Sequence, residues 1–328
     1  MASVCMSQYR KRVILMMKRL ISLLLILLML PAAVLAEGLV YDRTGNLTEE
    51  FVFPEGTPVL EIIFPRVYSS DCAILRFGDE VMMIDASTKN KTMRARIRTA
   101  VAAMGIDHID TAFNSHPHDD HIDGFQFVHE YAPVGKLYIA FPEDYDPRMK
   151  EAVKFCNAND IPILHVQDGD VLTMGPNGEV TLTVIQRWGT KNWDTNDQSA
   201  MLLIRYGERT ILFAGDVENR AQTDYGTNPP ETGLQADILK MPHHGQQPLQ
   251  NEFLAAVQPE IVFMNGAADV MNGGKKYLNK NGVPFILGYQ GLTRMRTDGA
   301  IWVVDYLHED NTDRQTINPV YNTTTDVP

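Results

Sequence analysis

The sequence predicts an α/β fold with two β-sheets in the middle and helices outside them. Segments rich in Ile, Leu and Val arrive in two clusters, and stretches with helical spacing lie between them. The most unusual polar motifs directly follow apolar segments, which places them at strand ends, where the sites of layered α/β proteins usually lie. With 45% hydrophobic and 21% charged residues, the 328-residue chain resembles an ordinary globular protein and can bury a large core.

Strands are expected where apolar and β-branched residues run together between turn residues. These segments are 57–64, 72–77, 81–87, 108–115, 136–141, 161–166, 180–186, 199–207, 209–216, 236–242, 261–265 and 301–306. Helices are expected where apolar residues recur every three or four positions, and Gly105 suits the C-cap of the first of them. These stretches are 90–105, 124–132, 146–160 and 251–257.

The first 36 residues differ from the rest of the chain. Basic residues precede an apolar run that starts at Leu20 and closes with small residues at Val34 and Ala36. This arrangement is typical of a secretory signal peptide, so we expect residues 1–36 to be cleaved and the protein to be secreted or held in the cell envelope. The alternative is an uncleaved membrane anchor, although the run from Leu20 to Ala36 is at the short limit for a span.

The rest of the chain is expected to form one domain, residues 37–308, followed by a polar tail, residues 309–328. Five of the 29 Lys and Arg lie in the signal, so the mature chain carries 24 of them against 41 acids, a net charge of −17. Such a surface repels polyanions, which argues against an avid nucleic-acid binder unless a local basic groove exists. Cys72 and Cys156 are expected to be buried thiols, with one disulfide as the alternative.

The stretch NSHPHDDHIDG, which begins at Asn114, holds three of the nine histidines. His116 and His118 are two residues apart, so an extended backbone directs both rings to one side, and the proline between them favours that backbone. A turn at Asp120 and His121 would direct these side chains to the same cavity. Imidazole and carboxylate are ligands of Zn²⁺ and similar divalent ions, and four of them split in pairs suit two metals. A loop of chance polar residues does not explain the spacing.

Two later motifs also follow apolar strands. Asp216 comes after TILFAG, and Gly215 permits a close turn beside a crowded centre. Its two carboxylate oxygens could hold two cations. His243 and His244 follow the segment ADILKMP. A Gly-Asp pair alone more often ends a β-hairpin, and a His-His pair alone more often lies on the surface. The inference that these residues bind metal therefore depends on the order of all the motifs.

In this order the motifs resemble those of the metallo-β-lactamase superfamily. HPHDDH fits the His-x-His-x-Asp-His motif, Asp85 in VMMIDAS resembles the Asp that supports the site from behind the ligands, and LKMPHHG resembles the late His motif. The resemblance covers Val59 to Tyr306 and implies a four-layer αβ/βα sandwich with two metals at one edge of the sheets. The ligands that it implies are His116, His118, Asp120, His121, Asp216 (bridging) and His244.

The sequence departs from this family at one ligand. Many members carry a further His before the bridging Asp, and the candidates here, His129 and His165, are both expected to be structural. At the expected place stands NDQSAMLLIRYG, which resembles a branch that includes the hydrolase domain of the competence DNA-uptake channel and phosphorylcholine esterase. Asn196, His243 or water would complete the shell of one metal. The missing His, and an Asp where many β-lactamases have Cys, argue against lactam hydrolysis.

The resemblance implies a metal-dependent hydrolase with two divalent cations, Zn²⁺ or alternatively Mn²⁺. Such a pair lowers the pKa of bound water from 15.7 to roughly 7 and suits phosphodiesters and phosphate esters. Asp120 is expected to orient the nucleophile, and His243 to bind metal or protonate the leaving group. The expected partner is a small-molecule or cell-envelope phosphoester, with membrane contact only through an uncleaved signal. A nuclease and a non-catalytic binding relic are the alternatives. Trp188 and Trp193 either form a rim for a quaternary ammonium or pack over the core.

Overall fold

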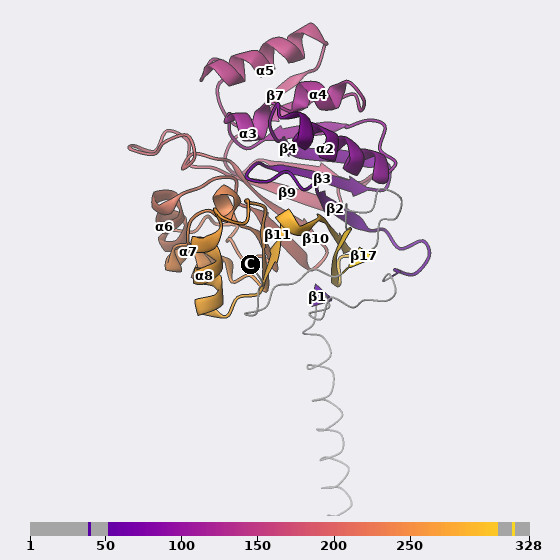
Figure 1. Cartoon of the computed structure of the whole chain (residues 1–328). Coiled ribbons are helices and arrows are strands. Elements are labelled where there is room, and N and C mark those ends of the chain that lie inside the picture. The colour runs from indigo at the N-terminus through magenta and orange to yellow at the C-terminus, as the bar shows by residue number, and fades with distance from the viewer. Residues whose placement is uncertain (1–38, 41–51, 308–316, 319–328) are drawn as a thin grey trace, which may run out of the picture. The chain divides into compact units, whose positions relative to one another are not determined.

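Two β-sheets form the centre of the fold, and helices lie on the outer side of each (Figure 1). The computed structural model describes residues 39–40, 52–307 and 317–318, which fall in one compact unit beginning at Leu39. This arrangement is the αβ/βα sandwich that the sequence predicted. The predicted signal at 1–36 lies outside the described residues. Within the described part of the chain, no helix combines the length and the apolar character that a membrane span requires.

The first sheet has the strand order β1-β16-β15-β2-β3-β4-β5-β6-β7. Strands β4 to β7 run parallel, whereas β2, β3, β15 and β16 pair with antiparallel neighbours. The bounds are β1 Leu39–Val40, β2 Leu60–Phe64, β3 Cys72–Phe77, β4 Glu80–Ala86, β5 Thr111–Asn114, β6 Leu137–Ile139, β7 Ile163–His165, β15 Leu292–Thr297 and β16 Trp302–Leu307. The helices of this half are α2 Lys91–Ala103, α3 Asp119–Ile122, α4 Phe125–His129 and α5 Pro147–Ala158.

The second sheet has the order β14-β13-β12-β11-β10-β9-β8. Strands β11 to β14 run parallel, and β8 to β11 form antiparallel pairs. The bounds are β8 Val171–Met174, β9 Val180–Ile185, β10 Met201–Tyr206, β11 Arg209–Phe213, β12 Ile238–Lys240, β13 Ile261–Met264 and β14 Phe285–Leu287. The helices of this half are α6 Asn219–Thr227, α7 Asn251–Val257 and α8 Asn272–Asn281.

Alternating side chains of β11 show how the layers are joined. Ile211 and Phe213 belong to the core between the two sheets, whereas Leu212 belongs to the core under the helices of the second half. Successive strand residues point to opposite faces, and both faces of this sheet are covered, so the strand needs an unbroken apolar run. Phe213 also stacks on Phe64 of the first sheet, with ring centroids 5.5 Å apart.

Most elements lie where the sequence predicted them, although their ends are shorter. The turn expected at Asp120 and His121 is one turn of helix, α3, and the tail contains a short strand, β17 Ile317–Asn318, that pairs with β16. The sequence analysis did not assign β8, α6, α8, β14 or β15. Cys72 and Cys156 are buried and unpaired, as expected.

Candidate metal centre

The candidate site lies where the carboxyl ends of parallel strands from both sheets meet. Asp85 is the second-last residue of β4, His116 follows β5, Asp216 follows β11, and the turn Pro242–Gly245 follows β12. Backbone hydrogen bonds join these ends: Ala200 N donates to Ser115 O (3.0 Å) and His243 N donates to Gly215 O (3.1 Å). These backbone hydrogen bonds fix the relative positions of the segments that carry the candidate ligands.

Asp216 lies at the centre of the site and is 1% exposed. Its Oδ2 atom is 3.2 Å from His121 Nε2, 3.4 Å from His244 Nε2 and 3.9 Å from His116 Nε2. His118 completes the near side, because its Nδ1 lies 3.1 Å from His116 Nε2. A carboxylate surrounded by imidazole nitrogens from three segments is the arrangement that a bridging metal ligand requires.

The short helix α3 brings Asp120 and His121 to the same cavity. Asp120 Oδ2 lies 3.0 Å from His244 Nε2, and Asp120 Oδ1 lies 3.9 Å from His121 Nε2. Gly124, which follows this helix, packs so closely on β4 that a Cβ atom there would be 1.7 Å from Ala86 O. The structure thus brings together all six side chains that the sequence marked as metal ligands.

Three residues that hold the site have left-handed backbone, which is costly for side chains other than glycine, about 1–3 kcal/mol each. They are Asp85 (φ 52°), His243 (φ 48°) and His244 (φ 58°). Position 215 also requires glycine, because a Cβ atom there would be 2.8 Å from Ser199 Cβ. Strain of this kind persists where the surrounding structure fixes it, and it is often found at functional sites.

Asp85 supports the centre from behind, the place that the family resemblance implies. Its Oδ2 lies 2.8 Å from His121 Nδ1 and accepts a hydrogen bond from Ser115 Oγ (2.7 Å), while Oδ1 accepts from Asn114 Nδ2 (3.0 Å). An acceptor at Nδ1 favours the tautomer whose Nε2 lone pair faces the site.

Sequence reasoning missed two acidic residues. Asp71, directly before β3, lies behind His244, with 3.1 Å between Oδ1 and Nδ1. Glu218, two residues after Asp216, lies at the rim, where its Oε1 is 2.9 Å from His243 Nδ1. In the sequence, Asp71 is only an acid directly before an apolar strand, and Glu218 is only an acid two residues after Asp216. Both are common in loops and point to no partner.

The position of the missing ligand is lined by polar groups that partly satisfy one another. Asn196 Nδ2 donates to Glu218 Oε1 (3.0 Å), while Asn196 Oδ1 is buried without a hydrogen-bond partner among the described residues. His243 Nε2 is 3.9 Å from Asp216 Oδ2. Asp197 instead caps α6, accepting from the N–H groups of Glu218 and Ala221.

His165 and His129 lie outside the cluster. The His165 side chain is 56% exposed and lies 3.3 Å from Glu143. His129 Nδ1 accepts from Val134 N (3.0 Å), and its ring packs edge-on against Phe155. Neither ring lies in the cluster; His129 has the structural contacts that the sequence analysis expected, whereas His165 is a surface side chain.

We therefore predict that His165→Gln and His129→Gln retain the metal content of the wild-type protein. His129→Gln should lose roughly 1 kcal/mol of stability with its hydrogen bond. Metal per chain, measured by mass spectrometry after dialysis, checks the prediction. Loss of one equivalent from His165→Gln would show that the missing ligand had been misplaced.

Burial and charge oppose each other in the metal-free cluster. Burial favours neutral His244, but the carboxylates of Asp216 and Asp71 outweigh it and raise the His244 pKa to about 9. Burial likewise opposes ionisation of Asp120, yet the His244 hydrogen bond and the His121 charge lower its pKa to about 2. Burial, reinforced by the charge of His121, holds the pKa of His116 well below its usual value.

These residues fit divalent cations. Ligand atoms of Asp71, His121, Asp216 and His244 lie within 4.8 Å of one another, and all four residues are buried. Two atoms that face the cavity, His121 Nε2 and Asp216 Oδ1, are buried without a hydrogen-bond partner in the described structure. Unpaired buried polar atoms are costly, and an ion would satisfy both.

The raised pKa of His244 predicts how metal affinity depends on pH. In the metal-free protein, the stabilising contribution of this residue is complete below its unfolded pKa of about 6.5 and is lost as pH rises through about 9. Metal must displace this proton and that of His121, whose pKa is also raised because the carboxylates of Asp216 and Asp85 outweigh burial, so apparent affinity should rise up to about tenfold per pH unit for each proton released. Chelator competition at pH 6.5, 7.5 and 8.5 measures this. A flat profile would contradict the charged state of His244.

The sandwich with a His and Asp cluster at the strand ends defines a class of metal-binding α/β proteins. The model of the family described as "Metallo-beta-lactamase superfamily" matches residues 65–266, more than half of the chain. The chain belongs to this superfamily, whose members are mostly metal-dependent hydrolases. No curated protein sequence matches it.

Several solved structures are similar in fold. CmlA, a diiron β-hydroxylase from Streptomyces venezuelae, has 14% identity over 70% of this chain and 52% of its own, with a TM-score of 0.46. A putative metal-dependent hydrolase from Parabacteroides distasonis has 12% identity over 70% and 93%, with a TM-score of 0.44. MEM-A1, a subclass B3 metallo-β-lactamase from a soil metagenome library, has 14% identity over 55% and 79%, with a TM-score of 0.37. The chain spans about half the length of CmlA.

Proposed function

We propose that this protein is an exported hydrolase of phosphodiesters or phosphate esters that depends on two divalent cations, Zn²⁺ or alternatively Mn²⁺. The observation that carries the proposal is the position of Asp216, whose Oδ2 lies within 4 Å of one member of each ligand pair, His116 of the pair His116 and His118, and His121 of the pair Asp120 and His121. Such a carboxylate can bridge two cations, and a pair of cations matches the oxygens of a phosphoryl group.

The residues divide between two cation positions. The first position would be held by His116, His118 and Asp216, and the second by Asp120, His121, His244 and Asp216. When bound, the two cations supply a nucleophilic oxygen at neutral pH and neutralise charge on the phosphoryl group. This chain supplies their spacing through Asp216.

Two residues at the rim have roles in the proposed reaction. Asp120 has a side chain that is 28% exposed, so it can accept a hydrogen bond from the attacking water and orient it. His243 is 22% exposed, with Glu218 beside Nδ1 and with Nε2 facing the cluster. Nε2 is thus placed to give a proton to the leaving oxygen. Glu218 is the charged neighbour of this ring, with Oε1 2.9 Å from Nδ1.

Two tryptophans and the net charge bear on which phosphoester the protein would hydrolyse. Trp193 is partly buried against Tyr225, with centroids 5.8 Å apart, and does not form a rim. Trp188 is 45% exposed and meets Phe141 edge-on at 4.8 Å, beside the ends of β6 and β9. This exposed ring supports a phosphocholine ester as one test substrate, in keeping with the branch resemblance. The net charge of −17 expected for the mature chain disfavours nucleic acid.

A screen of the purified, metal-loaded protein tests the proposal. The substrates are a nitrophenyl phosphomonoester, a bis-nitrophenyl phosphodiester, phosphocholine esters, single-stranded DNA, a lactone and a cephalosporin. Hydrolysis of a phosphoester that stops on chelation is expected. Preferred cleavage of DNA would favour the nuclease alternative, and hydrolysis of only the lactone or cephalosporin would overturn the phosphoester assignment. A protein that binds no metal and cleaves nothing would be the binding relic.

A further inference from the structure

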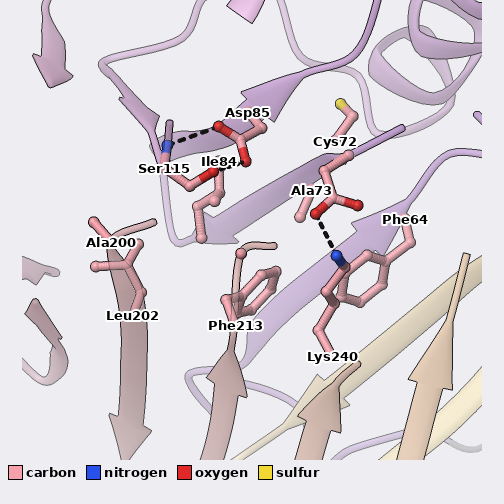
Figure 2. A pocket seen from close by; sticks show the side chains of 12 residues that line it. Phe64, Cys72, Ala73, Ile84, Asp85, Ser115, Ala200, Leu202, Phe213 and Lys240 are labelled. Atoms are coloured by element: carbon pink, nitrogen blue, oxygen red, sulfur yellow. Dashed lines mark hydrogen bonds and ion pairs between the residues drawn. The ribbon is translucent and has the colours of Figure 1, made fainter. Parts of the chain in front are cut away.

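Two buried carboxylates lie behind the metal centre, each behind a different histidine. Asp85 contacts His121 at Nδ1 (2.8 Å), and Asp71 contacts His244 at Nδ1 (3.1 Å). Both histidines belong to the same cation position in the proposed function. The two acids line one small pocket between the sheets, and Figure 2 shows Asp85 bonded to Ser115 on one side of it.

Asp71 is paired with a buried lysine from the other sheet. Lys240, the last residue of β12, is 2% exposed and forms an ion pair with Asp71 Oδ2, which Figure 2 marks by the dashed line from Lys240. Asn265 Nδ2 donates to Asp71 Oδ1. Burial opposes ionisation of Asp71, but Lys240 and His244 hold its pKa well below the usual range. Because burying an ion pair is costly, stability alone is a weak explanation for a pair at this depth.

The backbone of Asp71 also belongs to the site. Its N–H donates to Asp120 O (3.0 Å), and its carbonyl accepts from Ser87 N (2.7 Å), next to the strained turn that begins at Asp85. Asp71 therefore contacts the segment of one candidate ligand through its backbone and the ring of another, His244, through its side chain. A change in Asp71 should therefore disturb the cation position to which both Asp120 and His244 are assigned.

Asp71 is better placed to orient a ligand than to be one. Its ligand atoms lie within the cluster, yet Oδ1 already accepts from Asn265 and faces His244 Nδ1, and Oδ2 accepts from Lys240. Direct coordination would require breaking the ion pair with Lys240. An acceptor at Nδ1 instead leaves His244 Nε2 for the cation, the role that outer carboxylates commonly have at metal sites.

The other cation position lacks this support. His116 Nδ1 faces the hydroxyl of Ser115 (3.1 Å), and its Nε2 faces His118. Within the described residues, no carboxylate lies behind either of these two rings. The two positions therefore differ in how firmly their histidines are held.

We propose that Asp71, fixed by Lys240 and Asn265, is a positioning residue for His244, and that the cation position of Asp120, His121 and His244 is consequently the tighter of the two. This inference rests on the proposed two-cation function for its ligand sets. The inference is tested by metal affinity, so the result does not depend on which substrate the protein hydrolyses.

The test uses Asp71→Asn and the double variant Asp71→Asn with Lys240→Met, both in the full chain. Zn²⁺ binding to metal-depleted protein is measured by competition with a coloured chelator, and folding by thermal unfolding. The wild-type protein should bind one equivalent more tightly than the other. Asp71→Asn should weaken the tighter equivalent by roughly 10- to 100-fold and change the weaker one less.

The double variant separates positioning from stability. It removes the unpaired lysine that Asp71→Asn leaves buried, so it should recover stability. If Asp71 positions His244, metal affinity stays low in the double variant. Recovery of wild-type affinity together with stability would overturn the proposal, as would wild-type affinity in a folded Asp71→Asn protein or two equal binding steps in the wild type.

Asp237→Asn is the matched control. Asp237 lies at the opposite end of β12, where it accepts from Thr210 N (2.8 Å) and Trp302 Nε1 (3.1 Å). Its loss should lower stability and leave Zn²⁺ affinity unchanged. If Asp237→Asn weakened the tight equivalent as much as Asp71→Asn does, the effect would be general destabilisation and the proposal would fail.

Discussion

Asp216→Ala is expected to abolish phosphoester hydrolysis and to remove at least one metal equivalent. The carboxylate is within 4 Å of four imidazole nitrogens and belongs to both proposed ligand sets. Loss of a bridging ligand should cost more than the roughly 100-fold upper range for outer residues. Metal per chain and the rate on a bis-nitrophenyl phosphodiester are the measurements.

Asp110→Ala provides the control for this experiment. Asp110 precedes β5 at the end away from the site and accepts from Val81 N (2.8 Å). It should retain both metal equivalents and full activity, with a small loss of stability. Asp216→Ala protein that is folded, carries two metals and hydrolyses the diester at the wild-type rate would refute the bridging assignment.

His243→Ala is expected to act on the leaving group rather than on metal binding. If Nε2 protonates the leaving oxygen, hydrolysis of an alkyl phosphodiester should fall by roughly 10²- to 10⁴-fold, while an activated nitrophenyl ester should lose much less. Glu218→Gln should show the same selectivity with a smaller loss, because Glu218 lies 2.9 Å from His243 Nδ1. Rates on both substrates and metal content are measured together.

The contrast between substrates decides the role of His243. Equal losses on both esters, accompanied by loss of metal, would make His243 a ligand that fills the place of the missing histidine. In that case Asn196, whose Oδ1 atom is buried without a partner in the described structure, would no longer be needed to complete the shell. The general acid would then have to be sought elsewhere.

The six candidate ligands could be found from sequence because local rules place them. His116 and His118 alternate along an extended segment, and Asp216 and His244 each follow a short apolar strand. The carboxyl ends of parallel strands meet at one edge, so strand assignments alone suggested convergence. The layered fold followed from the same strands.

The supporting residues could not be found in this way, because they depend on contacts between distant segments. Asp71, directly before β3 of the first sheet, and Lys240, in β12 of the second sheet, are 169 residues apart in sequence. A lysine at the end of an apolar strand gives no indication that its charge is buried. From sequence, Trp193 is an aromatic residue in a loop, and only its packing on Tyr225 shows that it does not line the rim of the site.

Missed elements have a similar cause. Helix α8 is formed by NGGKKYLNKN, whose glycines and asparagines are poor helix formers, and Gly274 and Leu278 provide its buried side. There, Gly274 is required because a Cβ atom would be 2.6 Å from Gly245 O, directly after the late histidines. Tertiary packing outweighs local propensity at this helix.

The most direct test of the account is a metal titration of the chelator-treated protein, following bound metal and diester hydrolysis in the same samples. Zn²⁺ and Mn²⁺ are added separately in steps up to several equivalents per chain. The account predicts two bound equivalents, no hydrolysis without metal, and full activity only when both positions are filled. A folded protein that hydrolyses the diester equally well before and after metal removal, or that binds no metal at all, would contradict it.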